Sequence, residues 1–103
     1  MDDIEYVADN ISELSALIAL AEEASELSKA AMKLARAKGL LDNPTPISVA
    51  QAESDLIEEY NDLLICVCVL NKMPSLTISV DVDLRKRKCR RWAERIKNYK
   101  LEG

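Results

Sequence analysis

The sequence predicts an all-α protein, and three observations support this fold class. Leu, Ala, Glu and Lys recur throughout the chain, which is the composition of a helical protein. Only 2 Gly and 3 Pro interrupt it. Apolar residues repeat over long stretches with a period near 3.6 residues. The 103 residues suit one domain, so we expect residues 1–103 to form a single helical unit.

Two helices are predicted in the N-terminal part of the chain. The first covers about Asp3 to Asp9. Asn10 and Glu13 have the spacing of a capping box, so a second helix is expected to begin there and to extend to about Lys38. Gly39 follows at the place where glycine commonly ends a helix.

A third helix is predicted after a proline-containing loop. Asn43-Pro44-Thr45-Pro46 excludes helix at that point, because proline fixes φ and lacks a backbone donor. Ser48 and Gln51 form a second capping-box pattern, and a helix from about Val49 to Asn71 follows. The helix is nearly apolar all round towards its end, so we expect that end to be buried.

The last predicted helix covers about residues 83–99, with Asp81 or Asp83 as its N-terminal cap. Residues 76–82 before it alternate β-branched and polar side chains. A single short strand would have no partner, so a loop is expected there. Trp92 is expected to pack in the core, although stacking on a base is the alternative. The predicted apolar side consists of Leu84, Cys89, Trp92, Ala93 and Ile96.

The net charge of −4 is unevenly distributed along the chain. Residues 1–80 carry 14 acidic and 5 basic side chains, a net charge of −9, whereas residues 81–103 carry 4 acidic and 9 basic ones, a net charge of +5. A basic end on an acidic body suits a nucleic acid, the acidic body of a neighbour or a phosphate-bearing ligand. A solvated helix face is the alternative. The acidic body argues against a broad nucleic-acid footprint.

Residue types exclude several kinds of chemistry. The chain has no histidine, which excludes Ser-His and Cys-His catalysis and zinc sites of mixed Cys and His ligands. Three cysteines leave one unpaired in any disulfide scheme, and we expect buried, reduced thiols. The first residues are acidic, unlike a signal peptide, and the apolar runs are too short to span a bilayer. A cytoplasmic protein without a membrane partner is therefore predicted.

Two pairs of carboxylates lie in the middle of the two long predicted helices. Glu23 and Glu26 are three residues apart, as are Glu59 and Asp62, so the members of each pair share a helix face. The most apolar run of the chain follows Asp62, and an uncompensated acid is costly in such surroundings. If the two helices pack antiparallel, the four carboxylates converge, and oxygen ligands suit Mg²⁺ or Mn²⁺. A solvated acidic face is the alternative.

The two motifs, Glu22-Glu23-Ala24-Ser25-Glu26 and Glu59-Tyr60-Asn61-Asp62, resemble the EExxE and ExxD signature of the MazG-like all-α nucleoside triphosphate pyrophosphohydrolases. The likeness covers about residues 13–71. Asn61 departs from the pattern, since many relatives have a small residue before the Asp. The resemblance implies a four-helix-bundle-like fold of the MazG type with a metal site between the second and third helices. It also implies a homodimer or a homotetramer.

The resemblance also implies a function and the residues that perform it. Mg²⁺, with Mn²⁺ as the alternative, would assist hydrolysis of a nucleoside triphosphate to pyrophosphate and a nucleoside monophosphate, as in house-cleaning of the nucleotide pool. Glu22 would be a further ligand or the catalytic group that orients and deprotonates the attacking water. Lys29 and Lys33 are candidates for phosphate binding, with solvent exposure as their alternative. The implied metal ligands are Glu23, Glu26, Glu59 and Asp62.

Two functions of other classes remain as alternatives. A non-catalytic helical interaction module would have solvent-facing carboxylates and a stability that metal does not change. A nucleic-acid-associated protein would use the basic C-terminal helix and would bind with a steep salt dependence.

Overall fold

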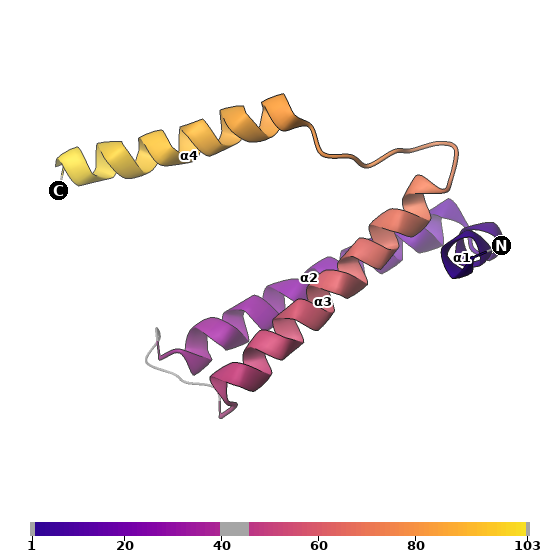
Figure 1. Ribbon diagram of the computed structural model, residues 1–103, viewed down its shortest axis with the longest axis horizontal. Helices are drawn as coiled ribbons and strands as arrows, with labels where there is room; N and C mark the ends of the chain where they lie inside the picture. The colour runs from indigo at the N-terminus through magenta and orange to yellow at the C-terminus, as the bar shows by residue number, and fades with distance from the viewer. Residues whose placement is uncertain (1, 40–45, 103) are drawn as a thin grey trace.

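The computed structural model describes residues 2–39 and 46–102, and this part of the chain is all-helical. It contains four helices and no strand, so the all-α prediction is confirmed (Figure 1). Residues 43–45 of the predicted proline loop lie outside the described residues. The helices are α1 (Asp3–Asn10), α2 (Glu13–Ala37), α3 (Val49–Asn71) and α4 (Val82–Glu102).

The boundary between α1 and α2 differs from the prediction at its cap. Asn10 is the last residue of α1, and its Nδ2 donates to the backbone oxygen of Tyr6 at 2.8 Å. Ser12 caps α2 instead, because its Oγ accepts from the backbone N–H of Ser15 at 3.0 Å. The predicted cap at Asn10 was therefore wrong: a side chain that bonds back into its own helix is not available to the next one.

The ends of α2 and α3 follow the predicted signals closely. Gly39 after α2 has a φ of 75°, in the left-handed region that glycine adopts without strain. Ser48 caps α3 by accepting from the backbone N–H of Gln51 at 3.1 Å. The side-chain amide of Gln51 is directed along α3 instead, where its Nε2 donates to Asp55 Oδ1 at 2.8 Å.

The fold is built on a hairpin in which α2 and α3 lie side by side and antiparallel (Figure 1). The helix α1 packs at one end of this hairpin, against α3. The principal buried cluster lies at that end, where Ile4 and Ala8 of α1 contact Ala16, Leu70 and their neighbours. The buried apolar residues are Ala16, Ala30, Ala52, Val69, Leu70 and Met73.

The predicted burial of the end of α3 is confirmed for one side of the helix. Val69 and Leu70 are buried, but Leu64 and Ile65 are exposed. Among the described helices, α1 and α2 are the ones that contact α3 extensively, and they leave the remaining side of this apolar helix uncovered.

The segment after α3 is a loop, as predicted, and it is tied to α3 by a pair of hydrogen bonds. Asn71 Nδ2 donates to the backbone oxygen of Ile78 at 2.8 Å, and Asn71 Oδ1 accepts from the backbone N–H of Ile78 at 2.6 Å. Ile78 also packs against the buried cluster. Asp81 then caps α4, since its Oδ1 accepts from the backbone N–H of Leu84 at 2.9 Å.

The helix α4 stands apart from the hairpin (Figure 1), and none of its residues is buried. The side chain of Trp92 is 63% exposed, so the prediction that it packs in the core was wrong. The reason is that no described element covers the apolar side of α4. The radius of gyration is 18.0 Å, compared with about 13 Å for a compact domain of about 100 residues.

Among the described residues, no helix is both long enough and apolar enough to cross a membrane.

Replacement of Leu70 should show how much the hairpin depends on its small core. Leu70 is 0% exposed, so Leu70→Ala should lower the free energy of unfolding by about 2–5 kcal/mol through lost burial and an unfilled cavity. Leu101, which is 86% exposed, provides the control, because Leu101→Ala removes the same atoms without creating a cavity. Urea titrations at one protein concentration would compare them, and equal losses would contradict this description of the core.

Candidate metal centre

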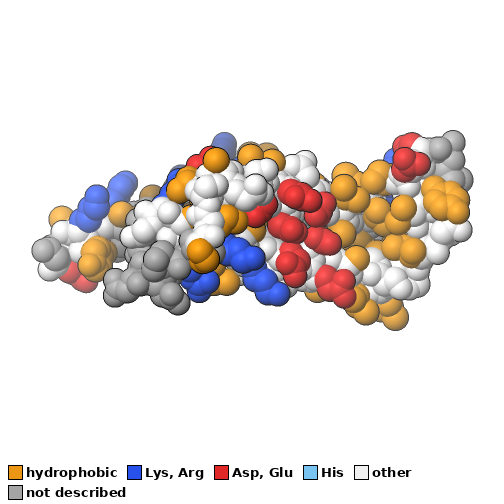
Figure 2. Space-filling model, turned by 90° about the horizontal axis from the view of Figure 1, so that it is seen from below, with side chains coloured by type: hydrophobic (Ala, Val, Ile, Leu, Met, Phe, Trp, Pro, Cys, Tyr) orange, Lys and Arg blue, Asp and Glu red, His pale blue; other side chains and the backbone are white. Residues whose placement is uncertain are grey.

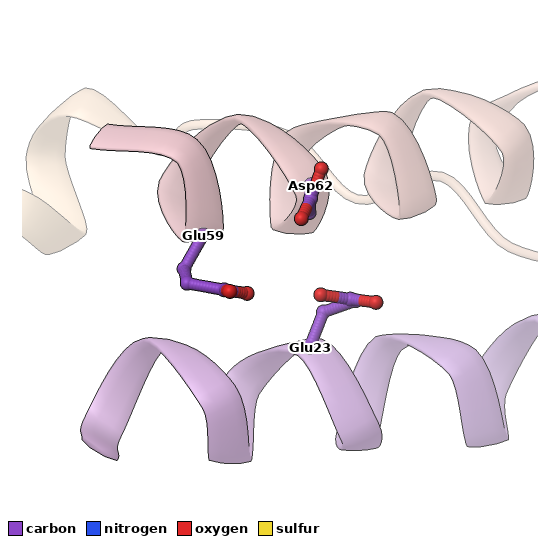
Figure 3. Close-up of side chains that lie close together, drawn as sticks. All are labelled: Glu23, Glu59 and Asp62. Carbon is purple, nitrogen blue, oxygen red and sulfur yellow. The ribbon is translucent and has the colours of Figure 1, made fainter. Parts of the chain in front are cut away.

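Three carboxylates of the predicted set meet between the two long helices. Glu23 projects from α2 towards Glu59 and Asp62 of α3 (Figure 3). One oxygen from each of the three lies within 4.8 Å of the others. All three side chains are half-buried. The convergence that the sequence predicts for these three residues is therefore present in the structure.

Their positions on the helices explain why they meet. Glu23 is seven residues from both Ala16 and Ala30, which are buried, and Glu59 is seven residues after the buried Ala52. Seven residues are close to two helical turns, so each carboxylate lies on the same helix face as these alanines. The acids thus occupy positions that face the partner helix, where an apolar residue would stabilise the hairpin.

Negative charge accumulates at this point, and among the described residues no basic side chain forms a salt bridge with the three carboxylates. Partial burial raises the pKa of Glu59 above its ordinary value, and the negative charges of Asp62, Glu23, Glu26 and Glu58 raise it further. In the part of the chain that the structure describes, the salt bridges are Lys29–Glu26 and Lys72–Glu5. None of the three clustered carboxylates belongs to either pair.

The other predicted site residues lie around this cluster. Glu26 is exposed, lies outside the group of three, and contacts Lys29 Nζ through its Oε1 at 3.5 Å. Glu22 is exposed on α2 beside Glu23. Lys33 lines a hollow next to the cluster. Figure 2 shows acidic side chains gathered on one face, with basic side chains beside them.

Asp55 is a residue of this region that the sequence analysis did not single out. It is half-buried and lines the same hollow as Glu26, Lys29, Lys33 and Glu59. Asp55 stands four residues before Glu59, so it lies on the same side of α3 one turn away. The four-residue spacing between Asp55 and Glu59 is visible in the sequence, but Asp55 lies outside the ExxD motif.

The cysteines correct one expectation about burial. All three are free thiols, but Cys68 and Cys89 are exposed and only Cys66 is half-buried. Cys66 follows Asp62 by one turn of α3. Burial, followed by the negative charges of Glu23 and Asp62, raises the pKa of its thiol above the ordinary value. The neutral thiol is thereby favoured next to the carboxylate cluster.

The donor set fits a small, hard divalent cation. Mg²⁺ binds oxygen at about 2.1 Å, so opposite ligands of an octahedral ion lie about 4.2 Å apart. Three ligands of one such ion include at least two adjacent pairs, whose oxygens lie about 3.0 Å apart. The three carboxylate oxygens, which lie within 4.8 Å of one another, would therefore move closer together on binding. Oxygen donors alone favour Mg²⁺ or Mn²⁺ over softer metals.

The raised pKa of Glu59 predicts a pH dependence of stability in metal-free protein. A carboxyl group whose pKa is higher in the folded state stabilises the fold while it is protonated, and this contribution is lost as the pH rises through the folded pKa. Relative to Glu59→Gln, the wild-type protein should therefore lose stability as the pH rises above 4.5, the ordinary pKa of a glutamate side chain.

Thermal unfolding in EDTA between pH 4.5 and pH 7 would measure this difference. Glu94→Gln on α4 is the matched control and should follow the wild-type curve, because Glu94 lies on a helix that makes no extensive contact with the hairpin. A constant difference between the wild-type protein and Glu59→Gln across this range would contradict the prediction.

Comparison of the chain with known protein families, with curated proteins and with solved structures found no match.

Proposed function

We propose that this chain is a Mg²⁺-dependent nucleoside triphosphate pyrophosphohydrolase of the MazG-like type, releasing pyrophosphate and a nucleoside monophosphate. One observation carries the proposal: Glu23 of the first motif faces Glu59 and Asp62 of the second across two antiparallel helices. The motifs are 33 residues apart in the sequence, and the fold brings their carboxylates together.

The energetics of the hairpin support a bound cation. Three carboxylates at positions that face the partner helix repel one another, and the pKa of Glu59 is raised by burial and, next, by the negative charges around it. A hairpin selected only for stability would have apolar residues here, as at Ala30 and Ala52. A bound Mg²⁺ or Mn²⁺ would offset the repulsion, neutralise phosphate oxygens and lower the pKa of a coordinated water.

The residues around the cluster have the chemistry that the reaction needs. Glu23, Glu59 and Asp62 would hold the cation, and Glu26 would extend the ligand set along α2. Glu22, exposed beside Glu23, would accept the proton of the attacking water as general base. Cleavage between the α- and β-phosphates would then leave pyrophosphate and a nucleoside monophosphate.

The hollow beside the cluster supports a phosphate-binding role for the two lysines. Lys29 and Lys33 from α2 line it together with Asp55 and Glu59 from α3. Their ammonium groups would neutralise the triphosphate on the side away from the cation. In this proposal the MazG-type arrangement also includes a homodimer or a homotetramer, since one chain buries only six apolar side chains among the described residues.

Metal binding should stabilise the protein. A ligand that binds only the folded state at 100 times its Kd raises the free energy of unfolding by about 2.7 kcal/mol. Thermal unfolding in increasing MnCl₂ or MgCl₂ should therefore show a rising midpoint, with Glu23→Gln much less responsive. Glu94→Gln is the control and should respond as the wild-type protein does. A midpoint that millimolar metal leaves unchanged would contradict a metal centre and favour a helical interaction module.

Pyrophosphate release from a panel of canonical and modified nucleoside triphosphates should depend on the metal and on both motifs. Asp62→Asn and Glu59→Gln should each lower kcat/KM by about 100-fold or more. Mutation of groups that only hold metal ligands in place already lowers metal affinity or activity by about 10- to 100-fold. Glu22→Gln should lower kcat while metal still stabilises the protein. Lys33→Ala should mainly raise KM.

Two controls make this assay decisive. Glu94→Gln should retain wild-type turnover, and EDTA should abolish it. If metal stabilises the protein but no triphosphate is cleaved, the hydrolase proposal fails while the metal centre stands.

A further inference from the structure

The helix α4 has an apolar stripe that no described element covers. Cys89, Trp92, Ile96 and Tyr99 follow one another at intervals of three or four residues, so they lie on one side of the helix. All four are exposed. Single exposed apolar residues are ordinary, but a continuous stripe that includes Trp and Tyr is typical of a contact surface.

The hairpin has a second exposed stripe of the same kind. Ile57, Tyr60 and Leu64 of α3 are also spaced by three and four residues. Ile57 is 63% exposed and Tyr60 is 52% exposed. These two apolar stripes, each on a long helix and each left uncovered by the described residues, are alike in chemistry.

We propose that the α4 stripe packs against the α3 stripe of a second copy of this chain, so that two copies exchange their C-terminal helices. Each copy contributes its α4 helix and the α3 stripe that binds the α4 helix of the other copy. A two-fold axis makes the two contacts identical. The exchange would cover the side of α3 that is exposed in the single chain.

The distribution of charge favours a second copy as the occupant. The segment 81–103, which contains α4, has a net charge of +5, whereas residues 1–80 have a net charge of −9. Glu53, exposed on α3, precedes Ile57 by one turn and places a negative charge at the edge of the receiving stripe. Arg85 and Lys86 lie beside the apolar stripe of α4 near its start. Opposite charges at the rim of an apolar contact assist the encounter and set its orientation.

The linker holds α4 apart from the hairpin of its own chain. Asn71 binds the backbone of Ile78 through two hydrogen bonds, and Ile78 packs on the core of its own hairpin. Only residues 79–81 separate this anchored point from α4. The helix α4 then runs back along the hairpin of its own chain without extensive contact with it (Figure 1), and the radius of gyration of 18.0 Å reflects this separation.

An anionic membrane or a nucleic acid would also attract the basic α4, but neither accounts for the second stripe. Binding of α4 to either surface would leave Ile57, Tyr60 and Leu64 exposed. A second copy covers both stripes with residues that the chain already provides.

The molar mass in solution provides the first test. The wild-type protein at micromolar concentration should have at least twice the mass of one chain, and the double variant Trp92→Glu/Ile96→Glu should have the mass of one chain. Leu101→Glu is the matched control, because Leu101 is an exposed apolar residue of α4 that lies off the stripe. It should keep the wild-type mass. Equal masses for the wild-type protein and the double variant would overturn the proposal, and circular dichroism would verify that both are helical.

Thiol cross-linking between two versions of the chain tests the specific contact. One version keeps Cys89 as its single cysteine through Cys66→Ser and Cys68→Ser. The other, made larger by a tag, has Tyr60→Cys as its single cysteine. A short bis-maleimide should join the two versions after they are mixed, and Trp92→Glu in the first should abolish the product.

Three outcomes of these experiments would overturn the exchange. The first is cross-linking only within single chains of a third version that has both Cys89 and Tyr60→Cys as its cysteines, which would indicate that α4 folds back on its own hairpin. The second is a product that links only Cys89 to Cys89, which would indicate pairing of two α4 helices. The third is a wild-type protein with the mass of one chain whose α4 binds anionic vesicles or DNA through Trp92.

Discussion

The antiparallel packing of α2 on α3 is the constraint on which the rest of the structure depends. Alanines at the contact, such as Ala16, Ala30 and Ala52, allow the two helices to approach closely. The same close approach brings Glu23 opposite Glu59 and Asp62, because all of them lie on the facing sides. Stability and the candidate site therefore share one interface. The alanines and the wider cluster near α1 contribute burial, and the carboxylates in the middle reduce it. A bound cation would make the two requirements compatible.

The helices were largely predictable, since each has a local signal. A 3.6-residue period, the serine at the start of α3 and Gly39 after α2 are properties of short stretches of sequence. The cap of α2 was harder, because Asn10 and Ser12 both suit that role and the choice depends on which side chain bonds back into α1. The convergence of Glu23, Glu59 and Asp62 was predictable once antiparallel packing was assumed. Asp55 was not, since nothing in a motif indicates how far along α3 the hollow extends.

The position of α4 could not be obtained from its sequence. An amphipathic pattern indicates that the apolar side of a helix packs against another surface, but it does not identify that surface. Trp92 was expected in the core of its own chain, but it is exposed, as is Ile96 on the same side of the helix. The same pattern fits packing within one chain, exchange between copies, and binding to a membrane or to a nucleic acid. The uncovered stripe on α3 favours packing of α4 on this protein itself over binding to a membrane or a nucleic acid, and it becomes visible only when the packing of the hairpin is known.

The placement of the buried cluster at the α1 end has a consequence for local unfolding. Val69, Leu70 and Met73 anchor that end of the hairpin, whereas near the opposite end only Ala30 and Ala52 are buried among the described residues. Segments with few buried apolar contacts open at lower free energy than the core does. The hairpin should therefore fray from its loop end, with amide hydrogens exchanging faster there than near α1. The carboxylates lie between these two ends, so fraying of the loop end would expose them to solvent while the end near α1 stays packed.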